Sequence, residues 1–325
     1  MASKTTAPAL PVTLLLPLSG PLAEVGGSMR RAAGLAQSSA SGGAGVTLDI
    51  RDTGGDPALA AREASAAIAS GARMILGPVT AAEVRATMAV AGAVPVIGFS
   101  NDPALLDSGA YVFGVTPVQS VAAILTYARD ENLSSLVAVV PPGAYGDAVS
   151  EAVETLTPRA GLRLAGVVRE AAGSRALQAR ISALSPPPDA VLIAHFGAGL
   201  GSVASSVRTA TDARILGTVQ WLRDGPLWDA ALEGAVFATP EPEGFATFAQ
   251  AYGKGPGLLA ALAFDAVRLA QTVGSTPAPL RDVLHRARGF DGVVGPYRLY
   301  ETGLCERELS TLTIRAGDVA RGTSS

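Results

Sequence analysis

The sequence predicts an α/β fold made of two similar lobes, each a mainly parallel sheet flanked by helices. In the first half, short apolar runs each end in a polar turn, and segments of helical length separate them. A second series of the same kind and of about the same length starts around the strand at residues 136–140. The apolar runs are mostly continuous rather than alternating, which is typical of strands buried on both faces of a parallel sheet. Right-handed crossovers would then place helices on both faces of each sheet.

The first series contains clear helix starts. Asp56-Pro57 and Thr116-Pro117 each combine an N-cap residue with a proline at the first helical position. The expected strands are residues 12–16, 46–50, 74–76, 94–97 and 111–113, and the expected helices are residues 22–38, 57–70, one between 80 and 94, and 118–131.

The second series continues the pattern and then changes character. The expected strands are residues 136–140, 163–168, 191–194, 214–216 and 235–238, and the expected helices are residues 145–156, 175–184 and 200–210. Residues 244–273 are predicted to be helical with a break near 253–257, and their second part is apolar nearly all round, which predicts deep burial. Residues 295–303 and 308–314 alternate like an antiparallel hairpin.

Two neighbouring turns are the main candidates for a binding site. Thr80 follows the strand at 74–76, and Ser100 and Asn101 follow the strand at 94–97. Ligands of open α/β sheets bind outside the carboxyl ends of the strands, so the pair of turns favours a cleft. The alternative is that these residues only cap the helices that follow them.

Composition excludes several classes of function. The chain has 325 residues, 48% of them apolar, and a net charge of −3 without long runs of one sign, which indicates two ordinary domains and no nucleic-acid partner. Cys305 is the single cysteine and there are two histidines, so we expect no disulfide and no metal site built on Cys or His. No dinucleotide or phosphate-loop motif is present, so no cofactor is expected. The start lacks an apolar signal segment and no membrane span is evident, which leaves open a cytosolic protein or one whose export signal has been removed.

The two histidines do not suggest catalysis. His195 ends an apolar strand near the proposed cleft, where a lone histidine is more often a hydrogen-bonded polar residue than a base. His285 lies in an Arg-rich segment, residues 281–288, interpreted as a solvated helix face. Since no set of nucleophile, base and orienting residue is recognisable, we expect no enzyme.

The ordered motifs resemble those of the type I periplasmic binding proteins, in particular the branched-chain amino-acid binders. The resemblance spans residues 12–315, and its motifs are residues 17–26 (PLSGPLAEVG), 77–78 (GP), 94–97 (VPVI), 145–146 (YG) and 263–267 (AFDAV). Three stretches look most like the penicillin-binding protein activators of proteobacteria, which are lipoproteins: residues 51–55 (RDTGG), 215–221 (ILGTVQW) and 289–299 (GFDGVVGPYRL).

The resemblance implies two Rossmann-like lobes joined by three crossing segments, with a ligand cleft between them. The crossings are expected near residues 115–118, 238–243 and 295. Lobe one would hold residues 1–115 and 245–293, lobe two would hold 118–240 and 296–315, and residues 1–11 and 316–325 would be flexible ends. The resemblance also implies a periplasmic protein whose export signal or lipid anchor has been removed, and which would touch a membrane only through that anchor.

The resemblance further implies a set of cleft residues. In amino-acid-binding relatives, hydroxyl and backbone N–H groups of the first lobe hold the ligand carboxylate and an acidic residue of the second lobe holds the ammonium. The expected cleft residues are Thr80, Ala81, Ser100, Asn101, Thr116, Tyr145, His195, Phe196, Gln220 and Trp221. Thr80, Ser100 and Thr116 would take the carboxylate, and Tyr145 and Phe196 would supply aromatic packing. Trp221 is equally consistent with a core residue beneath its loop.

This chain departs from that pattern at two places, one on the carboxylate side and one at the ammonium site. Ala81 stands where relatives often have serine, and Gln220-Trp221 stands where an acid is wanted, with Asp224 three residues further on. A buried ammonium without a partner costs several kcal/mol, so we expect no common amino acid to bind. The sequence therefore favours a regulator that contacts a peptidoglycan synthase, like the activators. The alternative is a solute-binding protein that delivers an amino acid or similar small molecule to an ABC permease.

Overall fold

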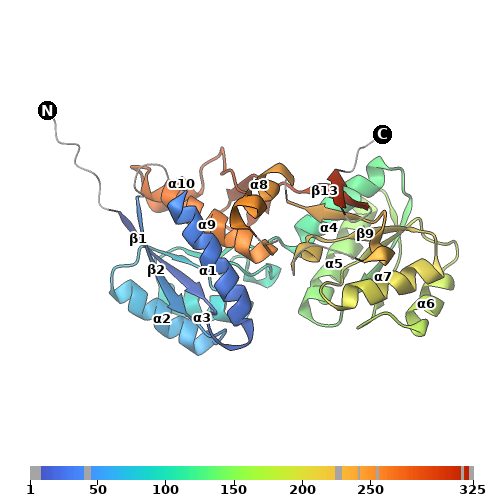
Figure 1. The fold of residues 1–325 in the computed structure, drawn as a ribbon, viewed down its shortest axis with the longest axis horizontal. Coiled ribbons are helices and arrows are strands. Elements are labelled where there is room, and N and C mark those ends of the chain that lie inside the picture. The colour runs from blue at the N-terminus through green and yellow to red at the C-terminus, as the bar shows by residue number, and fades with distance from the viewer. Residues whose placement is uncertain are drawn as a thin grey trace. The chain divides into compact units, whose positions relative to one another are not determined.

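The structure is a computed structural model that describes residues 9–39, 45–223, 229–240, 242–253, 256–315 and 318–321. The chain forms two compact α/β units (Figure 1). Unit 1 comprises Met1–Gly114 and Gly244–Arg307, and unit 2 comprises Val115–Glu243 and Glu308–Ser325. The chain therefore passes from one unit to the other three times. Every strand and helix expected in the two series is present, with ends that shift by a few residues.

Unit 1 contains a five-stranded parallel sheet in the order β2-β1-β3-β4-β5. Its strands are β1 (Leu10–Leu16), β2 (Val46–Asp52), β3 (Met74–Leu76), β4 (Val96–Gly98) and β5 (Tyr111–Val112). Its helices are α1 (Ala23–Ser38), α2 (Pro57–Ala69), α3 (Ala81–Ala91), α8 (Pro242–Tyr252), α9 (Leu258–Gly274) and α10 (Leu280–Leu284). Short 3-10 turns lie at Gly20–Leu22 and Pro103–Leu105.

Two pairs of helices pack on the sheet of unit 1. Helices α2 and α3 contact each other and share a core with β1, β3 and β4, in which Ala64, Ile75 and Val84 are fully buried. Helices α1 and α9 form the second pair, as Figure 1 shows, and the Gln271 side chain donates to the carbonyl of Ala36 between them. Twelve of the 17 residues of α9 are buried, in agreement with its nearly uniform apolar sequence.

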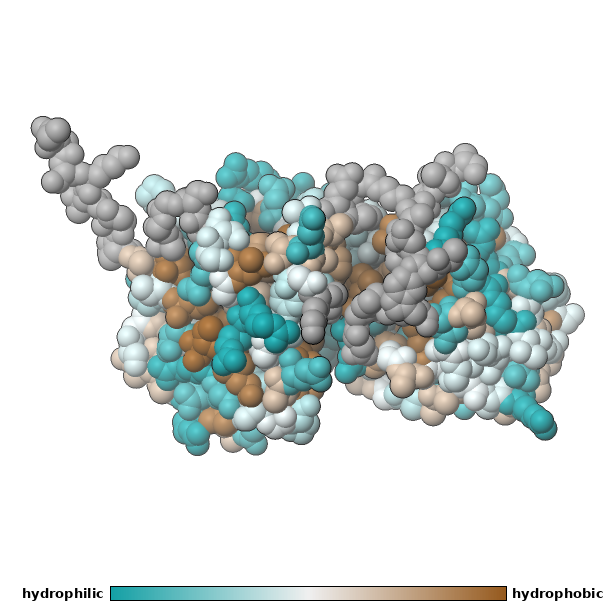
Figure 2. All heavy atoms as spheres, viewed as in Figure 1, coloured by the Kyte–Doolittle hydropathy of each residue, from teal (hydrophilic) through white to brown (hydrophobic). Residues whose placement is uncertain are grey.

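Unit 2 contains a seven-stranded sheet in the order β14-β13-β10-β9-β8-β6-β7. The run from β10 to β7 is parallel, β13 pairs antiparallel with β10, and β14 pairs antiparallel with β13. Its strands are β6 (Ser135–Val140), β7 (Arg163–Arg169), β8 (Ala190–Ile193), β9 (Arg214–Gly217), β10 (Val236–Thr239), β13 (Ser310–Arg315) and β14 (Asp318–Arg321). Helices α4 (Pro117–Asp130) and α5 (Ala144–Arg159) share one core with this sheet, and α6 (Arg175–Ser182) and α7 (Gly199–Ala210) share another. Over α6 and α7 the visible surface is mostly white and teal (Figure 2).

The C-terminal part of the chain differs from the sequence-based expectation. The expected hairpin pairs residues 295–303 with 308–314, but β11 (Tyr297–Leu299) pairs with β12 (Cys305–Arg307), and β13 pairs with β10 and β14. The third passage between the units therefore lies at residues 307–308 and not near Gly295. The β11–β12 hairpin stays in unit 1 because Leu304 bridges Val112 at the edge of its sheet.

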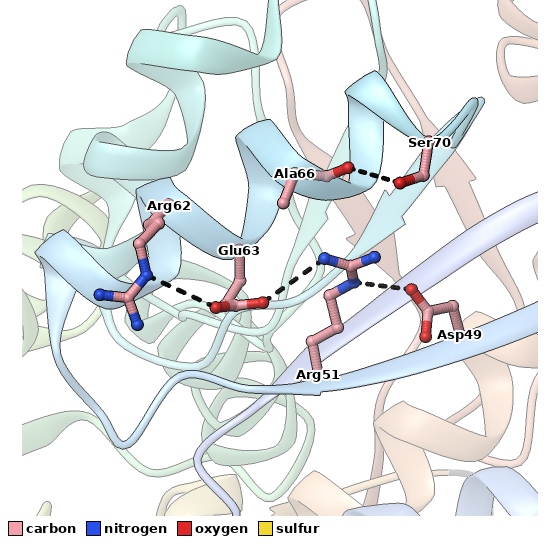
Figure 3. A network of polar contacts seen from close by, with 6 residues as sticks. All are labelled: Asp49, Arg51, Arg62, Glu63, Ala66 and Ser70. Atoms are coloured by element: carbon pink, nitrogen blue, oxygen red, sulfur yellow. Dashed lines mark hydrogen bonds and ion pairs between the residues drawn. The ribbon is translucent and has the colours of Figure 1, made fainter.

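The edge strand β2 is fixed to α2 by charged side chains. Arg51 Nε donates to Asp49 Oδ2 at 2.6 Å, and Arg51 Nη1 lies 3.4 Å from Glu63 Oε2 on α2 (Figure 3). Arg62 lies 3.6 Å from the other oxygen of Glu63. Charged residues of this kind discourage a second chain from pairing with an open sheet edge.

The next residue, Asp52, joins the turns that follow β1 and β2. Its Oδ1 accepts the backbone N–H groups of Leu18, Ser19 and Gly54. Burial alone would raise the pKa of Asp52, but these bonds and one from the Ser19 hydroxyl lower it below its usual value. The carboxylate therefore remains charged and holds the two turns together.

Among the described residues, no helix combines the length and the apolar character needed to cross a bilayer.

Candidate functional site

Each unit has an edge formed by the carboxyl ends of its parallel strands, and the candidate residues lie there. In unit 1, β3 leads to Thr80 and β4 leads to Ser100. These strands are neighbours, and the Phe99 N–H donates to the Pro78 carbonyl at 2.8 Å, so the two turns lie side by side as predicted. Gly77 starts the first turn with φ of +89°, and a Cβ there would lie 2.3 Å from the Leu15 carbonyl oxygen, so only glycine fits.

Thr80 is the N-cap of α3 and forms a capping box with Glu83. Its hydroxyl donates to Glu83 Oε2 at 2.7 Å and accepts the Glu83 N–H at 3.3 Å, and its own N–H donates to the same carboxylate oxygen at 3.0 Å. Glu83 is completely buried. The helix-capping interpretation therefore describes Thr80 better than the role of carboxylate ligand, because its hydroxyl proton is already used.

Thr116 repeats this arrangement in unit 2. It is the N-cap of α4, its N–H donates to Gln119 Oε1 at 2.9 Å, and it is 2% exposed. Both threonines belong to the sequence pattern Thr-x-x-Glu or Thr-x-x-Gln, which is the signature of a capping box.

We expect Thr80→Ala to lower the free energy of unfolding by about 1 to 2 kcal/mol, because it removes a cap and leaves a buried carboxylate with fewer donors. Thr80→Ser keeps the hydroxyl and should cost much less. Urea denaturation of both variants measures the difference. If Thr80→Ala unfolds like the wild type, the capping role assigned to this hydroxyl is wrong.

The donors left at the edge of unit 1 are backbone groups and one serine. The capping box leaves the N–H groups of Ala81 and Ala82, the first two of α3, without an acceptor in the described part of the chain. Ser100 is 7% exposed, and its oxygen accepts the Asp102 N–H at 3.2 Å, so its own proton can point elsewhere. Asn101 is half-buried beside it. These groups together offer donors suited to an anion at a helix N-terminus.

The edge of unit 2 brings together an aromatic pair. Tyr145 follows β6 and Phe196 follows β8, and because these strands are neighbours the two rings meet edge to face with centroids 5.5 Å apart. The Tyr145 hydroxyl lies 3.0 Å from the Thr218 hydroxyl, which follows β9. The Arg223 guanidinium lies over the Phe196 ring at 4.6 Å. Burial raises the pKa of Tyr145, against the hydrogen bond from Thr218, so the phenol stays neutral.

His195 is buried and bonded to the backbone. It is 3% exposed, and its Nε2 lies 2.7 Å from the Glu170 carbonyl oxygen, to which the neutral ring donates. Burial lowers the pKa of His195, although backbone hydrogen bonds with Glu170 and Val139 act in the opposite direction. No serine hydroxyl or carboxylate side chain is bonded to this ring among the described contacts. His195 is thus the hydrogen-bonded polar residue that its position in the sequence favours.

Trp221 is a core residue and is removed from the set of cleft residues. It is 2% exposed, stacks on Phe237 with centroids 5.6 Å apart, and donates its indole N–H to the Ile193 carbonyl at 3.1 Å. Gln220, beside it, is half-buried. His285 also differs from expectation: α10 ends at Leu284, and His285 is half-buried with its Nε2 2.7 Å from the Tyr111 hydroxyl, so it is not on a solvated helix face.

Three residues that organise these edges, Glu83, Thr218 and Arg223, are not among those predicted from the sequence. Glu83 could have been found from the Thr-x-x-Glu spacing. Thr218 lies within the motif at residues 215–221, but its contact with Tyr145 depends on the order of the strands in the folded sheet. Arg223 carries no sequence signal, because its stacking on Phe196 is set by the turn after β9. No group of three or more His, Cys, Asp or Glu side chains able to hold a metal ion occurs in the described residues.

A sequence model identifies the family to which the chain belongs. The sequence model of the periplasmic binding proteins matches residues 9–318, and the chain belongs to this family. A search of curated proteins gives no match.

Solved structures agree on the fold. A putative branched-chain amino acid ABC transporter protein from Rhodospirillum rubrum is 21% identical, with a TM-score of 0.80 over 96% of this chain and 99% of that one. A leucine-, isoleucine-, valine-, threonine- and alanine-binding protein from Brucella ovis is 17% identical, with a TM-score of 0.78 over 98% and 93%. A solute-binding protein of an ABC transporter from R. palustris, in complex with benzoate, is 19% identical, with a TM-score of 0.70 over 96% and 95%. All three have the type I periplasmic binding fold expected from the sequence.

Proposed function

We propose that the chain is the solute-binding component of an ABC importer. The observation that carries this proposal is the family match over residues 9–318, and the similar structures named above are ABC transporter components or amino-acid binders. The unpaired N–H groups at the start of α3 and the aromatic pair of unit 2 lie where open α/β sheets bind their ligands. The partner would be an ABC permease and the site of action the periplasm.

The comparisons favour this function over the regulator of peptidoglycan synthesis. The stretches that suggested an activator also have structural explanations. Arg51 and Asp52 fix the edge strand β2 and two turns, and Trp221 packs in the core of unit 2. Their presence therefore does not require a synthase as partner.

A thermal-shift screen tests the proposal. The full chain would be refolded from denaturant to remove any bound ligand, and then heated with a panel of amino acids, aliphatic carboxylates and aromatic carboxylates. Because a ligand stabilises the folded state by mass action, at least one class should raise the melting temperature in a concentration-dependent way. A flat response across the whole panel would count against a solute-binding function for these compounds.

The variant Ala81→Pro tests whether the edge of unit 1 contributes to solute binding. Proline is tolerated at the first position of a helix, Thr80 already has the extended backbone that a following proline needs, and Asp56-Pro57 and Thr116-Pro117 are natural examples. The variant removes one N–H donor, and we expect it to weaken binding of an anionic solute by about tenfold or more. Ala81→Ser keeps the N–H group and serves as the control. Equal affinities for the two variants would remove this N–H group from the site.

A further inference from the structure

The three places where the chain leaves or enters unit 1 are connected to one buried cluster. They are Gly114, Gly244 and Arg307, which lie far apart in the sequence. Contacts within unit 1 link all three to the buried carboxylate of Asp265, in the middle of α9. We call the cluster around this carboxylate the anchor, and its members are Phe113, Asp265, Tyr297 and Arg307.

The third passage starts directly after the positive charge of the anchor. Arg307 Nη1 lies 3.6 Å from Asp265 Oδ2, and neither side chain is more than 1% exposed. Solvent screens a buried pair of charges much less than an exposed one, so the attraction between them is effective. Arg307 therefore ties the end of unit 1 at this passage to α9.

The first passage is tied to the same guanidinium through a ring. The Arg307 guanidinium lies 4.4 Å from the centroid of the Phe113 ring, and Gly114 is the next residue after Phe113. Gly114 has little room to shift, because its N–H donates to the Ser100 carbonyl at 3.2 Å and a Cβ would lie 2.6 Å from that oxygen. Both contacts hold the backbone where the first passage begins.

The second passage ends on a loop that Asp265 holds. The carboxylate accepts the N–H groups of Val293 and Val294 at 2.8 and 3.1 Å. A Cβ on Gly244 would be in ordinary contact with the Val293 Cα, at 3.5 Å, so Gly244 packs on this loop. The loop comes close to the carboxylate because residue 292 is glycine: a Cβ on Gly292 would lie 2.5 Å from Asp265 Oδ2.

We propose that the anchor is a pivot: Asp265 and Arg307 hold the unit 1 ends of all three passages as one body, and the chain bends beyond them when the two units move. Hinge motions are absorbed by a few residues in the connections, and three connections held by one cluster must bend together. Because both side chains are buried, they are positioning residues and not solute ligands. That such a motion takes up a solute rests on the proposed function; the pivot itself does not.

Amide hydrogen exchange of the full chain without solute tests the pivot. Asp265→Asn removes the charge that holds Arg307, and Gly292→Ala keeps both charges but brings a Cβ against the carboxylate. In both variants we expect exchange at Gly114 to become about tenfold faster relative to exchange at Thr53. Thr53 is a suitable reference, because it follows β2, at the edge of the sheet opposite β5, and its N–H donates to the Leu16 carbonyl.

Met74→Ala is the matched control for a loss of stability. Met74 is fully buried and begins β3, whereas Gly114 follows the carboxyl end of β5, so the two lie toward opposite ends of the parallel strands. The truncation leaves a cavity in unit 1 but keeps the anchor, and the ratio of exchange at Gly114 to exchange at Thr53 should not rise. A rise as large as that in Asp265→Asn would overturn the proposal, and so would an unchanged ratio in both anchor variants.

The distance between the units tests the consequence for their motion. Ser65→Cys on α2 and Ser205→Cys on α7 place one dye on each unit at exposed positions, and the native Cys305 is buried. In single-molecule energy transfer, Gly292→Ala should broaden the distribution of transfer efficiencies, and Met74→Ala should leave it as in the wild type. Identical distributions for all three proteins would show that the anchor does not guide the motion, and the proposal would fail.

Neither measurement uses a solute, so the outcomes separate the pivot from the solute-binding function. If the anchor variants respond as expected and no compound of the screen binds, the pivot is supported and the solute-binding function loses its support. If a compound binds and neither the exchange ratio nor the transfer efficiencies respond, the solute-binding function stands and the pivot is wrong.

Discussion

Replacing Arg307 by methionine is expected to lower the free energy of unfolding by about 3 to 5 kcal/mol, because it leaves a buried carboxylate without its counter-ion. The Arg307 guanidinium lies between the rings of Phe113 and Tyr297, 4.4 Å from each centroid. Its Nη1 is 3.6 Å from Asp265 Oδ2, and both side chains are almost completely buried, at 0% and 1% exposure. These contacts tie together three separate segments of unit 1.

Asp265 has other partners that keep it in place. It accepts the backbone N–H groups of Val293 and Val294 at 2.8 and 3.1 Å. Burial raises the pKa of Asp265 to about 6, although Arg307 and the two N–H groups act to lower it. At neutral pH the carboxylate is therefore charged and depends on Arg307.

The double variant Asp265→Asn with Arg307→Met is the control for this prediction. Because asparagine is neutral, the double variant leaves no buried unpaired charge and should be more stable than Arg307→Met alone. Urea denaturation at neutral pH of the wild type, both single variants and the double variant gives the coupling energy. A coupling energy near zero would show that the two side chains do not depend on each other.

The same carboxyl group gives a pH dependence of known sign. Since the folded-state pKa of Asp265 is raised, its protonation stabilises the folded protein below about pH 4, and this contribution is lost as the pH rises through about 6. The stability of the wild type relative to Asp265→Asn should thus fall by up to about 3 kcal/mol between pH 4 and pH 7. A constant difference across that range would show that Asp265 has an ordinary pKa.

Trp221→Ala is also expected to lower the free energy of unfolding by about 3 to 5 kcal/mol, because it leaves a cavity in the core of unit 2. The indole packs against Phe237 and lies so close to Gly217 that a Cβ there would be 2.3 Å from the Trp221 ring. Trp221→Phe keeps most of this packing and should cost less. Gly217→Ala should also destabilise, because the ring cannot move without losing its bond to the Ile193 carbonyl.

Denaturation and solute binding, measured on the same Trp221 variants, distinguish a core residue from a ligand-contacting one. A core role predicts lower stability with solute affinity preserved at temperatures where the variant is folded. A variant of normal stability that no longer binds solute would return Trp221 to the binding surface.

The sequence was sufficient to predict the α/β class and the order of the elements, because continuous apolar runs and proline-marked helix starts are local signals. It did not locate the third passage between the units. Alternation identifies a strand but not its partner, and so β12 and β13 were not distinguished as partners of β11. The pairing depends on which buried surface each strand can cover, which is a property of the folded chain.

The candidate site was predicted in part for the same reason. The turns at Thr80 and Ser100 were found because strand ends and polar residues coincide in the sequence. The capping boxes of Thr80 and Thr116 were not predicted, although the glutamate and the glutamine three positions later are a local signal for them. The burial of Trp221 and the stacking of Arg223 on Phe196 result from tertiary packing, so the spacing of residues in the sequence does not predict them.

Isothermal titration calorimetry of the refolded chain is the most direct measurement of the solute-binding function. The solute that gives the largest thermal shift would be titrated into the wild type and into Ala81→Pro. The account predicts one site per chain with a dissociation constant of about 10 μM or lower, which is about −7 kcal/mol, and at least tenfold weaker binding by the variant. The absence of a saturable heat from every compound of the panel would contradict it.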